Sequence, residues 1–145
     1  MGGEVKRFQP LVEAYRQKAL QLGHEMKDLK IAVTGHTYIA DTYQQAASYY
    51  FPFYKNYKEQ VSQQLGKPKT FTEEMYKQLI APEEALFVGS PSEIVEKILR
   101  QHEWFGHHRF LAQIDIGGLP FRQAAKSLEL LATKVMPEVR KHLSQ

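Results

Sequence analysis

The order of strand-like and helix-like segments constrains the fold of this chain more than any other feature. Residues 30–42 (KIAVTGHTYIADT) and 109–116 (RFLAQIDI) are rich in β-branched and apolar residues and predict two strands, and the apolar run ALFV at 85–88 is a further candidate. Helical patterns, rather than two-residue turns, separate these segments. Strands connected in this way pair in parallel through right-handed βα units. The sequence therefore predicts an α/β fold with two or three parallel strands and flanking helices.

Capping signals mark the predicted helix after the ALFV run most clearly. Ser90, Pro91 and Glu93 fit the N-cap, first-turn and N3 positions of a helix start, and Gly106 fits its end. An earlier helix is predicted over residues 7–22, where apolar residues recur on one stripe.

A long central helix is predicted between the first strand and a loop around Gly66. Asp41 is its expected N-cap, with Gln44 completing a capping box, and Pro52 should kink or break it. A short helix is expected over residues 72–80. The predicted core contacts of the first and last helices are Phe8, Leu11, Val12, Tyr15, Ala19, Leu22, Phe121, Ala124, Leu128, Leu131, Val135 and Leu143.

Composition narrows the classes of function. The 145 residues carry 19 basic and 16 acidic side chains, a net charge of +3 that is spread along the chain, so no basic stripe indicates nucleic-acid binding. Cysteine is absent, which excludes disulfides, thiol catalysis and cysteine-bound zinc. The six histidines show no metal-ligand spacing, so no metal site is predicted. With no signal-peptide core and no long apolar run, a cytoplasmic protein is expected.

Alternation along the predicted strands indicates where a ligand would bind. Phe110, Ala112, Ile114 and Ile116 form one apolar side of the last strand, and the opposite sides of both strands become polar toward their C-terminal ends. Ligands in α/β folds bind beyond the carboxyl ends of parallel strands. The candidate binding residues at these ends are His36, Tyr38, Gln113, Asp115, Gly117 and Gly118.

Structural roles would also explain these residues. His36 could bond a neighbouring loop, and Tyr38 could fill a strand face. Gln113 and Asp115 could belong to an internal salt bridge or to a solvent-exposed face of the strand. The Gly117–Gly118 corner could be an ordinary turn. The aromatic run of residues 49–57 indicates core packing or a contact with further protein.

The quoted segments resemble, in order, parts of the bacterial luciferase-like, flavin-dependent monooxygenase family. GHTYIADT followed by QQA resembles a late strand and its helix, FVGSPSEIVEKI a helix start, and HHRFLAQIDIGGLP the last barrel strand. The opening GGEVKRFQPLVEAYRQKALQLGH resembles the segment after the sixth strand, which places Gly2 and Gly3 at the end of that strand. The resemblance covers essentially the whole chain, so residues 1–145 are interpreted as the C-terminal portion of such a domain.

The resemblance implies an incomplete part of a (β/α)8 TIM barrel that binds reduced flavin mononucleotide (FMN) and oxidises a small organic substrate with O2. Family members are roughly twice this length or more, as the barrel requires, and no catalytic residue can be carried over to this chain. The isolated chain is therefore expected to be inactive, with a partner chain supplying the remaining strands or a homo-oligomer forming. The alternatives are a non-catalytic, self-associating or partner-binding module and a remnant that keeps only flavin affinity.

Overall fold

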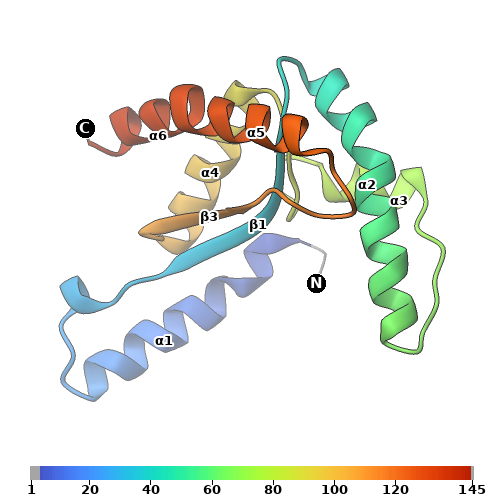
Figure 1. Cartoon of the computed structure of the whole chain (residues 1–145). Helices are drawn as coiled ribbons and strands as arrows, with labels where there is room; N and C mark the ends of the chain where they lie inside the picture. Colours follow the sequence, from blue (N-terminus) through green and yellow to red (C-terminus); the bar gives the residue numbers. More distant parts are fainter. Residues whose placement is uncertain (1–3, 145) are drawn as a thin grey trace.

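The computed structural model describes residues 4–144 and follows the expected alternation of strands and helices (Figure 1). Gly2 and Gly3 lie outside the described residues. In chain order the elements are η1 (Val5–Phe8), α1 (Gln9–Gln21), η2 (Met26–Asp28), β1 (Ala32–Ile39), α2 (Tyr43–Gln64), α3 (Glu73–Leu79), β2 (Phe87–Gly89), α4 (Pro91–Phe105), β3 (Arg109–Gln113), α5 (Phe121–Leu130), the π-helical η3 (Leu131–Val135) and α6 (Met136–Leu143).

The three strands form one parallel sheet with the order β2-β1-β3. The first half of β1, Ala32–His36, pairs with Arg109–Gln113 of β3, and its last three residues, Thr37–Ile39, pair with Phe87–Gly89 of β2. The predicted α/β class, the parallel pairing and the candidate third strand are confirmed. The sheet is open, as expected for part of a barrel.

One face of the sheet is covered by α4, α5, η3 and α6 (Figure 1). Phe110, Ala112 and Ile114 pack there with Ile39 of β1, which confirms these members of the predicted apolar side. The strand ends at Gln113 rather than at residue 116, and Ile116 packs in the other cluster with α2, so its predicted place on this side is wrong. The backbone N–H of Ile39 donates to Ser127 Oγ at 2.9 Å, so α5 is also tied to β1 by a buried hydrogen bond.

The last helical segment is buried along a different stripe from the predicted one. Leu131 and Val135 are in the core as expected, but Phe121, Leu128 and Leu143 are 86%, 56% and 48% exposed, so their predicted burial is wrong. The Ser127 hydroxyl, rather than Leu128, faces β1. From Ser127 onward the buried positions recur every four residues and pass through the π-helical turn. They are Ser127, Leu131, Val135 and Val139.

The helices α2 and α3 pack together against the other face of the sheet, around the C-terminal half of β1 (Figure 1). Tyr50 and Tyr54 of α2 are fully or almost fully buried, and the Tyr38 ring stacks on Tyr50 with a centroid distance of 5.1 Å and an interplanar angle of 2°. Core packing therefore accounts for this part of the aromatic run. Of the predicted kink or break at Pro52, the break does not occur, because the helix continues through this residue. The tyrosine contacts on either side hold both halves against the sheet.

The start of α2 lies one residue later than predicted. Thr42, not Asp41, is the N-cap, and its Oγ1 accepts a hydrogen bond from the backbone N–H of Gln45 at 3.2 Å. The Asp41 carboxylate instead accepts from Lys126 Nζ at 2.5 Å, which links the β1–α2 junction to α5. By contrast, the predicted capping box of α4 is confirmed, with Glu93 accepting from the Ser90 N–H at 2.8 Å.

A buried lysine anchors the connection between α3 and β2. Lys97 of α4 is 4% exposed, and its ammonium donates to the carbonyl oxygens of Leu86 at 2.5 Å, Ala81 at 2.7 Å and Ile80 at 3.4 Å. Burial lowers the pKa of Lys97 to about 7, although the charge of Glu84 opposes this shift. The three carbonyls satisfy all three donors of the ammonium and fix the 80–86 segment on α4.

The apolar stripe predicted for the first helix is largely uncovered. Of its members only Ala19 is buried, whereas Leu11 and Leu22 are 68% and 67% exposed, so the expectation of a core face is wrong for this structure. The helix is held at its middle by Arg16, whose Nη2 donates to the Phe105 carbonyl at 2.5 Å. The α-helix begins at Gln9, two residues later than predicted, and its predicted end is confirmed by Gly23, which has a φ of 84°.

Candidate functional site

A cavity of about 450 Å³ opens beside the first half of β1 and contains two of the predicted binding residues, His36 and Gln113. This volume is in the range of about 300–1,000 Å³ that is typical of small-molecule sites. We refer to it as the His36 cavity. Its walls come from η1, β1, α2, the start of β2, α4 and the end of β3, and they include Phe8, His36, Tyr54, Tyr57, Gln101 and Gln113.

His36 presents an aromatic and polar surface to this cavity. Its ring lies edge-on to Tyr57 and Tyr54, with centroid distances of 4.9 and 5.7 Å. Its Nδ1 is buried and has no hydrogen-bond partner among residues 4–144. Burial lowers the pKa of His36, and the nearby positive charge of Lys58 lowers it further. The imidazole is therefore neutral near pH 7 and offers one donor and one acceptor.

Gln101 is a second polar group in the cavity wall, and sequence reasoning missed it. The residue is 2% exposed, and both its Nε2 and its Oε1 are buried without a hydrogen-bond partner in the part of the chain that the structure describes. A buried amide without hydrogen-bond partners destabilises the fold by about 1–3 kcal/mol. Such a group is therefore a candidate for binding a ligand. The signal was present in the sequence, because Gln101 follows Ile94 and Ile98 at helical spacing on the side of α4 that is buried.

Tyr38 lies away from the cavity, inside the core formed with α2. Its hydroxyl donates to Gln123 Oε1 at 3.3 Å, and burial raises the pKa of the phenol. Tyr38 and His36 belong to the same side of β1, but α2 buries Tyr38 almost completely, whereas its Tyr54 and Tyr57 rings contact His36 and leave the imidazole on the cavity wall. The strand face is thus divided into a packed half and a half that lines the cavity.

The Gly117–Gly118 corner also lies outside the cavity, against α2. Gly117 has a φ of 64°, and a Cβ built on it would lie 1.9 Å from the Phe53 carbonyl oxygen. Asn56 Nδ2 donates to the Gly117 carbonyl at 3.1 Å, and the Asp115 side chain is exposed to solvent. The close approach to α2 explains why glycine is needed at residue 117.

Comparison with known proteins decides the family. The sequence model of the luciferase-like monooxygenases matches residues 2–108, which is most of the chain. The chain belongs to the luciferase-like monooxygenase family. Among curated proteins, no relative matches the sequence.

Solved structures share the fold of this luciferase-like chain. The monooxygenase RslO1 from Streptomyces bottropensis superposes with a TM-score of 0.70 at 21% identity, covering 92% of this chain and 38% of that one. The oxygenating constituent of 3,6-diketocamphane monooxygenase from Pseudomonas putida, solved in complex with FMN, gives 0.61 at 23% identity, covering 88% and 38%. Apo-MsnO8 gives 0.56 at 16% identity, covering 86% and 40%.

These likenesses establish a shared fold, and the luciferase-like chain spans about two fifths of the length of the matched structures. Within residues 4–144, no helix is both long and apolar enough to span a membrane. In the same part of the chain, no three His, Asp or Glu side chains are grouped so that they could hold a metal ion.

Proposed function

We propose that this chain forms part of a flavin-dependent monooxygenase domain, in which one atom of O2 is incorporated into an organic substrate. The family match over residues 2–108 carries the proposal. The FMN complex of the Pseudomonas putida neighbour supports FMN as the cofactor. When bound, reduced FMN supplies the electrons that activate O2.

The His36 cavity is where we propose that the ring system of the flavin binds. Tyr57 and His36 offer aromatic surfaces, and the unpartnered amide of Gln101 offers both a donor and an acceptor. The pyrimidine edge of a flavin presents N–H and C=O groups side by side, which is the complement of a primary amide. Gln113, which lies in the same cavity, would contact the open side of the ring.

The remaining predicted cofactor residues stay predictions. Tyr38, Asp115, Gly117 and Gly118 lie outside the His36 cavity, and no contact among the described residues assigns them to a ligand. We further propose that the chain alone turns over no substrate, since it spans about two fifths of the matched monooxygenases and none of its residues has been given a catalytic role.

Fluorescence titration and oxygen consumption test these proposals separately. FMN fluorescence is expected to change as the purified chain is added, and Gln101→Leu should weaken this binding by about 5-fold or more, a loss typical of one buried hydrogen-bond pair. Unchanged fluorescence would refute the cofactor assignment. With NADH and a flavin reductase the chain should consume no more O2 than the reductase alone, and robust substrate oxidation would refute the proposed inactivity.

A second candidate function is a self-associating or partner-binding module. Exposed apolar side chains on and next to α1 and at the start of α5 favour it. Leu11 and Leu22 are about two-thirds exposed, and Phe121 of α5 is 86% exposed. Multi-angle light scattering should then show a dimer or larger species that Leu11→Glu dissociates. A monomer at all concentrations would exclude homo-oligomers and leave only a different partner chain.

A further inference from the structure

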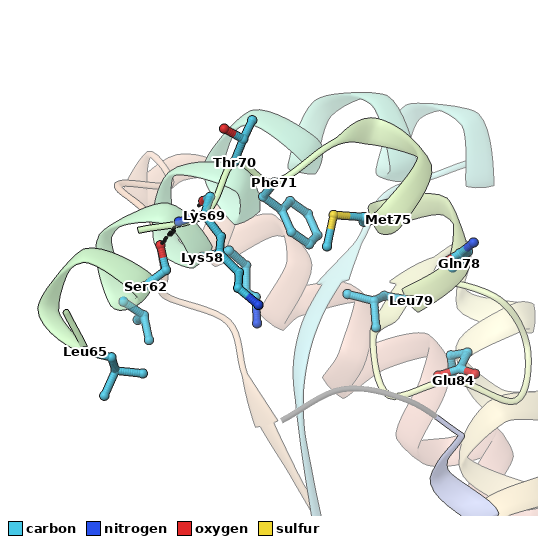
Figure 2. A pocket seen from close by; sticks show the side chains of 11 residues that line it. Lys58, Ser62, Leu65, Lys69, Thr70, Phe71, Met75, Gln78, Leu79 and Glu84 are labelled. Carbon is cyan, nitrogen blue, oxygen red and sulfur yellow. Dashed lines mark hydrogen bonds between the residues drawn. The ribbon is translucent and has the colours of Figure 1, made fainter. Parts of the chain in front are cut away.

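A second cavity, of about 440 Å³, lies between the C-terminal half of α2, the loop that follows it, and α3 (Figure 2). We call it the α2–α3 cavity. It shares only Leu79 with the His36 cavity, so the two are neighbouring but separately lined. No predicted binding residue lies in it, and the proposed flavin site does not use it.

The floor of the α2–α3 cavity is apolar, although much of it is open to water. Phe71 is buried at the base, while Met75 and Leu65 are 44% and 72% exposed. Figure 2 shows side chains from the helix, the loop and α3 directed toward one open space. A ligand body that covered these side chains would remove apolar surface from water, at about 25 cal/mol per Å2.

Two of the three charged side chains in the lining are basic. Lys58 extends from α2 and Lys69 from the loop, and within the described residues neither ammonium forms a salt bridge. In Figure 2 both side chains reach toward the open space. Glu84 is the acidic group of the lining and lies beyond Leu79, on the side of the α3–β2 connection.

From this arrangement we infer that the α2–α3 cavity binds a small carboxylic acid with an apolar body. The body packs on Phe71, Met75 and Leu79, and the carboxylate accepts hydrogen bonds from Lys58 and Lys69. Two unpaired ammonium groups beside an apolar floor favour an anion over a neutral compound of the same shape. The polarizable Met75 thioether can adapt to a flat or a flexible body, so ring and chain acids share this chemistry.

A charge series of one ring system tests the inference without any flavin. 2-Naphthoate is expected to bind the purified chain about 10-fold more tightly than 2-naphthalenemethanol, and 2-naphthylmethylammonium should bind more weakly than either. Lys58→Gln and Lys69→Gln should each weaken naphthoate binding by about 3- to 5-fold, as expected for partly exposed ion pairs, and leave the alcohol unaffected. Octanoate in competition shows whether a chain acid occupies the same site.

Matched variants localise the site. Lys77→Gln removes an ammonium that is paired with Glu73 on α3 and does not line the cavity, so it should leave naphthoate binding unchanged. Met75→Glu places a negative charge on an exposed wall position and should reverse the preference, favouring the ammonium probe over naphthoate. Equal binding of naphthoate and the alcohol, or a loss in Lys77→Gln as large as in Lys58→Gln, would overturn the inference. Circular dichroism of each variant excludes unfolding as the cause.

Discussion

Replacing Gly117 by alanine should destabilise the fold more than any other single methyl addition at the Gly117–Gly118 corner. The residue has a φ of 64°, and a left-handed conformation costs an alanine about 1–2 kcal/mol. The new Cβ would also lie 1.9 Å from the Phe53 carbonyl oxygen, which is backbone in the middle of α2 and cannot rotate away. Relieving such a clash requires α2 and the corner to separate, at a further cost of about 1–3 kcal/mol.

Gly118→Ala provides the matched control. Its φ of 81° imposes a similar backbone penalty, but nothing lies within 4 Å of an added Cβ. Urea unfolding followed by far-ultraviolet circular dichroism should therefore show losses of about 2–5 kcal/mol for Gly117→Ala and about 1–2 kcal/mol for Gly118→Ala. Equal losses in the two variants would show that the corner does not pack on α2 as described, and would refute the reasoning.

Three further perturbations probe the buried polar groups. Because burial lowers the folded-state pKa of Lys97 to about 7, the unfolded chain holds more protons between pH 7 and 10.5, so stability should rise with pH across that window; Lys97→Met should lose this rise in urea midpoints. Lys58→Gln should raise the pKa of His36 in an NMR titration, since it removes a nearby positive charge, whereas Lys77→Gln should not; no upward shift would contradict the placement of Lys58. Gln101→Leu should raise the free energy of unfolding by about 1 kcal/mol, because two unpartnered amide atoms leave the interior; a clear loss of stability would show that the amide has partners.

Local signals predicted the elements of this fold well. The capping box at Ser90 and Glu93 and the glycine stops at Gly23 and Gly106 are read from a few adjacent residues, and each is confirmed. The parallel pairing followed from helices that separate the strands. These features depend on interactions between residues that are close in sequence, so they can be predicted from the sequence alone.

Predictions that depended on distant contacts were less successful. Thr42 rather than Asp41 caps α2 because Asp41 pairs with Lys126, which lies 85 residues away in sequence. Alternation placed Phe110 and Ala112 correctly on the side that the helices cover, but it cannot tell that α2 buries Tyr38 and leaves His36 on a cavity wall. Only the tertiary arrangement of α2 decides which half of the polar strand face is available to a ligand.

The pairing of β1 with β3 has a consequence for how the chain folds during synthesis. Thr34 and Leu111, which are linked by a hydrogen bond of 3.2 Å, are separated by 77 residues, whereas β2 contributes only three residues to the sheet. A ribosome adding about 5–20 residues per second exposes β1 for several seconds before β3 emerges. Residues 87–89 of β2 emerge earlier and can pair with Thr37–Ile39, but the edge that pairs with β3 stays open throughout, so this stretch of the nascent chain is where a chaperone would be needed most.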